Sequence, residues 1–244
     1  MESGICRQPK ILIIGIHGEY EPWLDIFKEG QKKTWMTSTE NSMIVNAFGL
    51  PIKSKTRVID EKIYYLRWSS NKIIAYGSLL IEAIVKTIVP LHKLRPCIRY
   101  ENNYALGDIW RIEMCDTLML QGVKNIAVFR NALKFKFDYL VTTITSSYLN
   151  VPALEAYLSE VKASRFIGGR LEFSGELKYQ QGSFRVYSRD IVEDIVVNSR
   201  KYRHWKIEDV AMGNLISSFA DQLTEIPNRT LATIEEVEDR KSVV

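Results

Sequence analysis

The stretch "FDYLVTTITSSYLNVPALEAYL", residues 137–158, contains a buried strand, a hydroxyl-rich loop and a helix in succession. Asn150 is a suitable N-cap residue, and Pro152 suits the first helical turn. An apolar stripe follows at helical spacing, at Leu154, Tyr157, Leu158 and Val161. Loops that leave the carboxyl ends of parallel strands commonly bind ligands, yet no charged residue lies between Asp138 and Glu155. The stretch therefore predicts a strand–loop–helix unit of a parallel sheet, with hydroxyls where a binding loop often carries carboxylates.

The same alternation of strands and helices runs through most of the chain. Apolar runs predict strands at 11–16, 41–51 and 62–68, and two short later strands at 165–169 and 182–188. Helical spacing predicts helices over 21–35, from 71 to near Pro90, and over 122–135, 189–196 and 208–223, whereas 93–111 has no clear period and is expected to be loop. This order predicts an α/β fold with a mixed, mainly parallel central sheet flanked by helices. We expect one domain over residues 1–224, with 225–244 as a C-terminal tail or linker.

Composition and charge exclude several classes of protein. The chain has 244 residues, a net charge of +4 and three widely spaced cysteines, which form no disulfide framework and no zinc-binding spacing. The mild basic balance alone does not indicate nucleic acid as a partner. The most apolar stretch, 73–91, is interrupted by Glu82 and Lys86 and ended by Pro90, so a buried helix is favoured over a membrane span. No signal peptide precedes the first strand, and the cytosol is the expected compartment.

The common catalytic and cofactor-binding motifs are missing. The sequence has no Walker loop, no G-x-G-x-x-G after the first strand and no G-x-S-x-G. Its three histidines form no H-E-x-x-H motif. These absences argue against the most common dehydrogenases, nucleoside triphosphatases and hydrolases.

Four segments carry a family resemblance: "GQKKTW" (30–35), "FDYLVTTITSSYLN" (137–150), "GSFRVYSRD" (182–190) and "KIEDVAMG" (206–213). In this order they resemble GT-A glycosyltransferases of the β-1,3-galactosyltransferase/fringe type. The counterparts in that family are "IRxTW", "FDYLLKTDDD", "GxGYVLSRD" and "EDVYVG", and the match spans roughly residues 10–220. The resemblance implies a GT-A fold and the transfer of a sugar from a nucleotide-sugar to a hydroxyl group. Because the eukaryotic members are commonly anchored by an N-terminal membrane helix, and the first strand here begins near residue 10, the resemblance implies a bacterial or viral cytosolic enzyme, or one domain of a longer protein.

The sequence departs from this family at the acidic triplet, whose positions are occupied by Ile144, Thr145 and Ser146. In the family the triplet holds a divalent metal at the donor diphosphate, and hydroxyls do not replace carboxylates as ligands of hard cations. Carboxylate-free loops such as "TNLSS" and "TTTSS" occur in bacterial and viral relatives, and "EDVAMG" resembles their "DDVAIG". We therefore expect weak or no metal dependence, no metal-ligating residues and no required cofactor. Mn²⁺ or Mg²⁺ would enter only through the donor diphosphate.

The resemblance assigns the catalytic residues and one acceptor residue. Asp209 matches the general base of the inverting members, and Glu208 is the second choice; the alternative is that both acids only complement a helix dipole. Arg189 lies in the segment that matches the family's "SRD" and is expected to contact the acceptor or the transferred sugar. From the residue types themselves, Gly182 is expected to let the backbone approach the sugar, with a turn as the alternative, and Trp205, close to Glu208 and Asp209, is expected to stack on a sugar, with core packing as the alternative. Asp190 is left open between a structural and a functional role.

The residues that bind the nucleotide-sugar donor are expected in the hydroxyl loop, at the end of the first strand and among nearby lysines. The expected donor-binding residues are Gly15, His17, Lys33, Lys124, Thr143, Thr145, Ser146 and Ser147, with Lys32 as a further cation and the N-terminus of the helix near Val151 as a partial positive charge. A purely structural His17 and a loop that serves only as a polar turn are the alternatives.

Three hypotheses follow. The first is a glycosyltransferase that uses a nucleotide-sugar donor, a UDP-sugar foremost, and a glycan or glycoconjugate acceptor, with no nucleic-acid partner and no integral membrane segment. The second is a catalytically inactive glycosyltransferase-like domain that binds a glycan or a protein. The third, a nucleic-acid-binding module, ranks last because no motif supports it.

Overall fold

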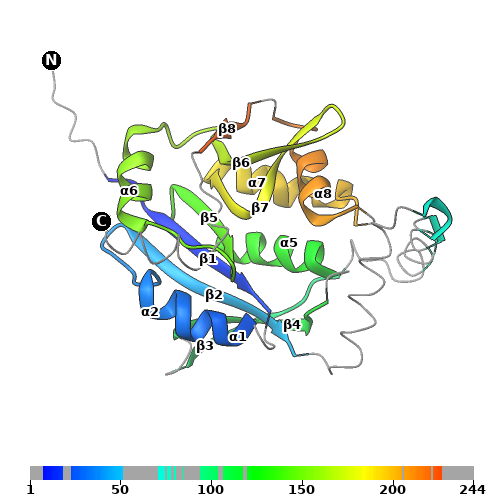
Figure 1. Ribbon diagram of the computed structural model, residues 1–244. Helices are drawn as coiled ribbons and strands as arrows, with labels where there is room; N and C mark the ends of the chain where they lie inside the picture. Colours follow the sequence, from blue (N-terminus) through cyan, green and yellow to red (C-terminus); the bar gives the residue numbers. More distant parts are fainter. Residues whose placement is uncertain are drawn as a thin grey trace, which may run out of the picture.

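Figure 1 shows the computed structural model of the protein. It describes residues 8–18, 23–51, 71–74, 76–77, 80, 84, 94–103, 107–117, 120–204, 206–220 and 222–226. The strand expected at 62–68 and the side chain of Trp205 lie outside the described residues. In the stretch expected to be helix up to Pro90, the described positions 72–74, 76–77, 80 and 84 are helical.

An eight-stranded sheet forms the centre of the molecule, in the order β3-β4-β2-β1-β5-β7-β6-β8. Its strands are β1 (Ile11–His17), β2 (Ser42–Leu50), β3 (Ile98–Asn103), β4 (Gly107–Cys115), β5 (Tyr139–Ile144), β6 (Ile167–Ser174), β7 (Leu177–Ser188) and β8 (Thr224–Glu225). Strands β4, β2, β1 and β5 are parallel neighbours, and β3 and β7 run in the opposite direction. The predicted mixed, mainly parallel sheet is confirmed.

Helices cover both faces of the sheet (Figure 1). The longer ones are α5 (Gln121–Ala132), α6 (Val151–Glu160), α7 (Arg189–Val197) and α8 (Glu208–Ile216). A helical segment also runs through α1 (Trp23–Asp25), a π-helical stretch (Ile26–Gln31) and α2 (Lys32–Thr34). Among the described residues, no helix has both the length and the apolar character needed to cross a membrane.

The pleat of the strands divides the core into two layers. In β1, Leu12 and Ile14 face one side and Ile11 and Ile13 the other, since side chains alternate along a strand. The first layer is filled from α5, α7 and α8, with buried side chains such as Ile126, Phe129, Ile191, Ile195, Met212 and Leu215. The second is filled mainly by α6 and the segment after α2, through Leu154, Leu158 and Trp35. The sheet is therefore covered on both faces, as a parallel sheet requires.

Two expectations about secondary structure are wrong, one about a loop and one about the end of a helix. Residues 93–111, expected to be loop, contribute β3 and most of β4, which form an antiparallel pair. Strand β3 is the sheet edge, and its residues Ile98 and Tyr100 alternate with the polar residues Arg99 and Glu101, so it lacks the apolar run of a central strand. The last helix ends at Ile216 instead of continuing to 223.

The C-terminal boundary expected at 224/225 falls inside strand β8 (Thr224–Glu225). This strand pairs in parallel with β6, and the carboxylate of Glu225 accepts a hydrogen bond from the Leu171 backbone N–H (3.2 Å). Ile226 is 7% exposed and packs in the second layer of the core. The sheet therefore extends to Glu225, and the packed core extends to Ile226.

Candidate functional site

The four segments that carry the sequence resemblance meet at the carboxyl edge of the parallel strands. Strands β1 and β5 both end there, at His17 and Ile144. Strand β7 passes the same edge in the opposite direction near Gly182, because Phe184 pairs with Thr143. Helix α8 begins beside β7, with Glu208 and Asp209 in its first turn. Direct hydrogen bonds join all four segments.

The hydroxyl-rich loop after β5 is held from two sides. The side-chain amide of Gln31, which is buried, donates to the backbone oxygens of Ile144 (2.8 Å) and Ser147 (2.7 Å). On the other side, the hydroxyls of Thr143 (3.2 Å) and Ser147 (2.8 Å) both donate to the backbone oxygen of Ser183. The segment "GQKKTW" and the start of "GSFRVYSRD" therefore fix the path of the loop.

His17 occupies a buried, apolar position next to this loop. Its ring lies 4.6 Å from Phe27 and 5.2 Å from Phe48, measured between ring centroids. Burial lowers the pKa of the imidazole to about 3, so the ring is neutral at physiological pH. Nε2 lies 3.1 Å from Asn46 Oδ1, which only accepts, so Nε2 carries the proton. Nδ1 then accepts from the Thr145 hydroxyl at 2.9 Å.

The contacts of His17 favour the structural interpretation of this residue. Its imidazole is 1% exposed, and both ring nitrogens have protein partners. Gly15 lies beneath the ring, because an added Cβ at that position would be 2.2 Å from His17 Nε2. Gly15 and His17 therefore pack against each other at this edge.

Three of the four loop hydroxyls assigned to the donor have already used their proton. Thr143 and Ser147 donate to Ser183, and Thr145 donates to His17. A hydroxyl has one donor hydrogen, so these groups have none left for the oxygens of a diphosphate. Ser146 is exposed, and it is the loop hydroxyl best placed to donate to a ligand.

The two lysines assigned to the donor differ in their surroundings. Lys124, with a side chain 5% exposed, donates to Asp116 Oδ1 (2.8 Å) and to the His17 backbone oxygen (2.7 Å). Its charge is therefore balanced by a buried carboxylate. Lys33 lies on the exposed side of α2 and pairs with Glu29, and both side chains are more than half exposed. A surface pair of this kind is weak and can be exchanged for another anion.

Arg185 joins the two acids at the start of α8 to strand β7. Its guanidinium donates to both carboxylate oxygens of Glu208 (2.9 and 2.8 Å) and to Asp209 Oδ1 (2.7 Å). Arg185 is 2% exposed and the Glu208 side chain 9%. Asn125 donates to Glu208 Oε1 (2.6 Å), so three charge-assisted hydrogen bonds hold this carboxylate. Glu208 is a fixed, buried anion.

Asp209 differs from its neighbour in exposure and in proton affinity. Its side chain is 29% exposed, so the carboxylate reaches the surface of the edge. Burial of most of the carboxyl group raises the pKa of Asp209 to about 7. The negative charge of Glu208 raises this pKa as well, whereas the positive charge of Arg185 lowers it. The Arg185 charge and hydrogen bond lower the pKa of Glu208, which outweighs its burial. The pair thus contains one permanently ionised acid and one acid that exchanges protons near neutral pH.

Gly182 lies directly against Asp209. A Cβ added at Gly182 would be 2.5 Å from Asp209 Oδ1 and 3.3 Å from Arg185 Nη2. The Gly182 backbone N–H also hydrogen-bonds the Asp209 carboxylate, which opposes the rise of its pKa. The absence of a side chain at position 182 therefore allows β7 to approach the acid.

Arg189 is separated from the other expected site residues. Strand β7 carries it to the opposite edge, where Ser188 pairs with Tyr139 at the beginning of β5. There it donates to the backbone oxygens of Phe135 (2.7 Å) and Leu133 (2.9 Å). Asp190, beside it, accepts from the Arg165 backbone N–H (2.9 Å). The structure therefore places neither residue with Asp209, and Trp205 lies outside the described residues.

Several residues of the edge were not assigned from the sequence: Gln31, Asp116, Asn125 and Arg185. Gln31 and Arg185 lie inside segments that carry the resemblance, but their roles depend on partners 23 to 116 positions away in the sequence. In the part of the chain that the structure describes, no group of three His, Cys, Asp or Glu side chains could hold a metal ion.

No protein-family model and no curated protein matches the sequence. The structure is similar to that of the glycosyltransferase GlyE of Streptococcus pneumoniae TIGR4, with a TM-score of 0.41 and 10% identity over 97% of this chain and 49% of that chain. It is also similar to glucosyl-3-phosphoglycerate synthase of Mycobacterium tuberculosis in complex with UDP, with a TM-score of 0.40 and 9% identity over 94% of this chain and 75% of that chain. The chain spans about half the length of the first protein. At these TM-scores the backbones agree only in part, so neither similarity assigns the chain to a family.

Proposed function

We propose that this protein is a glycosyltransferase that moves a sugar from a nucleotide-sugar, a UDP-sugar foremost, to a hydroxyl of a glycan or glycoconjugate. The observation that carries the proposal is Asp209. It is a partly exposed carboxylate with a pKa of about 7, fixed by Arg185 and Gly182 at the carboxyl edge of the parallel strands. A general base is most effective when its pKa lies near the working pH.

In the proposed reaction the acceptor hydroxyl attacks the anomeric carbon of the donor sugar. Asp209 takes the hydroxyl proton as the new carbon–oxygen bond forms. The bond between the anomeric carbon and the diphosphate breaks, and the nucleoside diphosphate leaves with the bonding electrons. Attack from the face opposite the leaving group inverts the anomeric centre.

Arg185 and Glu208 act as positioning residues for this base. Glu208 neutralises and orients the Arg185 guanidinium through two hydrogen bonds, and Arg185 holds Asp209 Oδ1. Since only Oδ1 of Asp209 is bound by Arg185, the second carboxylate oxygen is the one we assign to the acceptor proton. This arrangement follows the general pattern in which a base is oriented by a second charged group.

The donor diphosphate is assigned to Ser146, Lys33 and the beginning of α6. Ser146 is exposed, and Lys33 has only a surface ion pair with Glu29. Helix α6 begins at Val151, with Asn150 capping the Ala153 N–H (3.1 Å), and its N-terminal end carries a partial positive charge. Lys124, Thr143, Thr145 and Ser147 are assigned to shaping this surface, because their donors are engaged. Weak or no dependence on Mn²⁺ or Mg²⁺ remains part of the proposal.

The replacement Asp209→Asn tests the proposal. Release of the nucleotide (UDP, GDP, dTDP or CMP) is measured with UDP-, GDP-, dTDP- and CMP-sugars and a panel of glycan acceptors, with Mn²⁺ or with EDTA. Loss of the base should lower kcat/KM by about 100-fold or more, whereas thermal stabilisation by the donor should be retained. In the unmodified protein, kcat/KM should rise with pH up to an apparent pKa near 7 and then level off.

The matched control is Asp194→Asn. Asp194 also pairs with an arginine, Arg165, but on α7, away from the carboxyl edge. This control should retain the turnover of the unmodified protein. Equal turnover in Asp209→Asn and Asp194→Asn would remove Asp209 as the base, and no stabilisation by any nucleotide-sugar would remove the donor class.

One observation favours a second candidate, a catalytically inactive domain that binds a glycan or a protein. The hydroxyls of Thr143, Thr145 and Ser147 are bound within the protein, which is what a purely structural loop requires. This candidate predicts saturable glycan binding, no stabilisation by nucleotide-sugars, and no effect of Asp209→Asn on either.

A further inference from the structure

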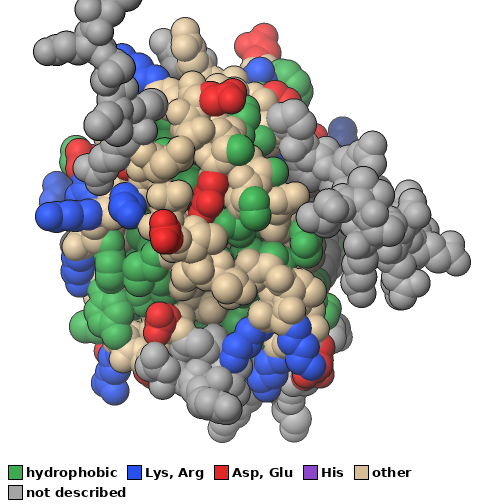
Figure 2. Space-filling view, turned by 90° about the vertical axis from the view of Figure 1, so that its left-hand side faces the viewer, with side chains coloured by type: hydrophobic (Ala, Val, Ile, Leu, Met, Phe, Trp, Pro, Cys, Tyr) green, Lys and Arg blue, Asp and Glu red, His purple; other side chains and the backbone are tan. Residues whose placement is uncertain are grey.

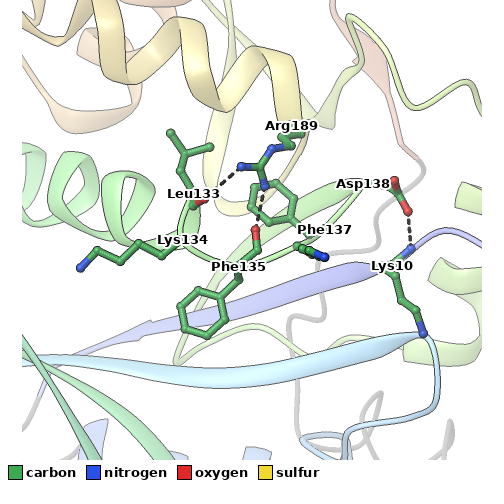
Figure 3. A pocket seen from close by; sticks show the side chains of 8 residues that line it. Lys10, Leu133, Lys134, Phe135, Phe137, Asp138 and Arg189 are labelled. Carbon is green, nitrogen blue, oxygen red and sulfur yellow. Dashed lines mark hydrogen bonds between the residues drawn. The ribbon is translucent and has the colours of Figure 1, made fainter.

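A second candidate site lies at the opposite edge of the sheet, where the parallel strands begin. A cavity of about 300 Å³ is bounded there by Lys10 ahead of β1, the loop 133–138 between α5 and β5, and Arg189 at the start of α7 (Figure 3). Figure 2 shows the molecule from the side that is on the left in Figure 1, where β1 and β2 start, with Lys and Arg side chains gathered around the margin of this face. The cavity contains none of the residues assigned to sugar transfer in the proposal above.

The cavity is lined by more positive than negative groups. Its charged residues are Lys10, Lys134, Lys136 and Arg189 against the single carboxylate Asp138, which gives a formal lining charge of +3. Outside the lining, Glu193 pairs with Arg189, and the Lys10 ammonium donates to the Glu40 backbone oxygen (2.9 Å). Asp138 is itself engaged, since its Oδ2 accepts from the Lys10 backbone N–H (2.6 Å). Among the described residues, no carboxylate forms an ion pair with Lys134 or Lys136.

Arg189 forms a fixed cationic wall of this cavity. Its guanidinium lies 5.0 Å from the centre of the Phe137 ring and donates to the backbone oxygens of Leu133 and Phe135 (Figure 3). These contacts occupy the carbonyl groups that would otherwise repel an anion. Its Nε donates to Glu193 (3.1 Å), so two of the five N–H donors of the guanidinium remain.

We propose that this cavity binds a phosphate group. An arginine held in place beside flexible lysines is a combination that recognises phosphate oxygens by charge-assisted hydrogen bonds. The volume is at the lower end of small-molecule sites, roughly 300–1,000 Å³, so it fits one or two phosphate groups better than a whole nucleotide-sugar. The phosphate belongs either to a small soluble molecule or to a lipid headgroup, because both present the same oxygens.

Phosphate binding is tested by titrating the protein with inorganic phosphate and with pyrophosphate at constant ionic strength, followed by ¹H–¹⁵N NMR. We expect saturable shifts centred on the amides of residues 133–138 and on the Arg189 Nε–H. The double replacement Lys134→Ala with Lys136→Ala should weaken binding by about tenfold or more, since each lysine contributes a charge-assisted hydrogen bond. Both lysines are exposed, so this variant should fold.

The matched control replaces Lys178 and Lys201, two exposed lysines that do not line the cavity, by alanine. A second arm measures sedimentation with phosphatidylcholine vesicles, with and without phosphatidylglycerol. Saturable binding of free phosphate that depends on Lys134 and Lys136 assigns a soluble ligand, and binding only to the anionic vesicles with the same dependence assigns a headgroup. The proposal is overturned if neither ligand binds saturably, if the two double variants weaken binding equally, or if the shifts centre on the carboxyl edge. In that case the cations serve only to complement the carboxyl end of α5.

Discussion

At the residue scale, two buried charged or titratable groups define the candidate site. Arg185 and His17 are 2% and 1% exposed, but their environments are opposite. Arg185 is surrounded by carboxylates, which keep it charged and raise its pKa despite burial. His17 has only neutral hydrogen-bond partners and a nearby lysine, so burial keeps it neutral. Arg185 therefore fixes Asp209, the proposed base, and His17 supports the hydroxyl loop without a charge.

The neutrality of His17 predicts a loss of stability in acid. Because its pKa is about 3 in the folded protein and 6.5 in the unfolded chain, the unfolded chain binds more protons between these values. Stability should therefore fall as the pH decreases from 6.5, by on the order of 1 kcal/mol per pH unit from this group. In His17→Gln this contribution is absent, so the difference in free energy of unfolding between the two proteins should shrink as the pH falls from 7 to 5.

Urea unfolding at several pH values measures this difference. Asp209 contributes in the opposite direction, because its raised pKa favours the folded state as the pH falls below 7, but it is present in both proteins and cancels. Between pH 7 and 8 the difference should be constant, which provides the internal control. A constant difference down to pH 5 would show that His17 is not held neutral.

At the element scale, the contact between β7 and α8 positions the proposed base. Gly182 and Arg185 come from β7, and Glu208 and Asp209 come from the first turn of α8. The sequence resemblance brought attention to both segments and to three of these residues. It did not indicate Arg185. This arginine lies in a strand next to Val186 and Tyr187, and its neighbours in the sequence do not show that two carboxylates of α8 bind it.

The close approach at Gly182 predicts the effect of a single methyl group. Gly182→Ala should displace the Asp209 carboxylate and break its hydrogen bond to the backbone, which raises the pKa of Asp209 further above its ordinary value. A displacement of this size near the reacting groups is expected to lower turnover by about 100-fold. Carbon-13 NMR of the Asp209 carboxyl group during a pH titration measures the first effect without requiring a substrate.

Gly30→Ala is the control for this experiment. An added Cβ at Gly30 meets no atom within 4 Å, so the pKa of Asp209 should stay as in the unmodified protein. If Gly182→Ala gave the same titration curve as Gly30→Ala, the contact between Gly182 and the acid would not exist in solution.

At the scale of the whole molecule, the sheet extends further at both edges, through β3 and β8, than the sequence predicted. The central strands were predictable, since β1, β2 and β5 are continuous apolar runs that lie between other strands. The edge strands β3 and β8 were not, because β3 carries polar residues and β8 has only two. Their existence depends on pairing with distant strands, and local periodicity contains no information about such pairing.

The role of β8 can be tested through the residue that follows it. Ile226 is 7% exposed and packs against Gly168 and Phe166, so Ile226→Ala should lower the free energy of unfolding by about 2–4 kcal/mol. Val197→Ala is a suitable control, since Val197 is 77% exposed and its truncation should cost less than about 0.5 kcal/mol. Equal stabilities for the two variants in urea unfolding would mean that the chain beyond residue 223 does not belong to the folded unit.

The pairing of Thr145 with His17 also restricts how this loop can change over evolution. A carboxylate at position 145 would face the lone pair of Nδ1 on a neutral ring. It would be tolerated only if the ring gained a proton, inside an apolar environment and near Lys124. Substitutions at 17 and 145 are therefore expected to occur together in relatives of this protein, and an acidic triplet cannot be introduced by changing the loop alone.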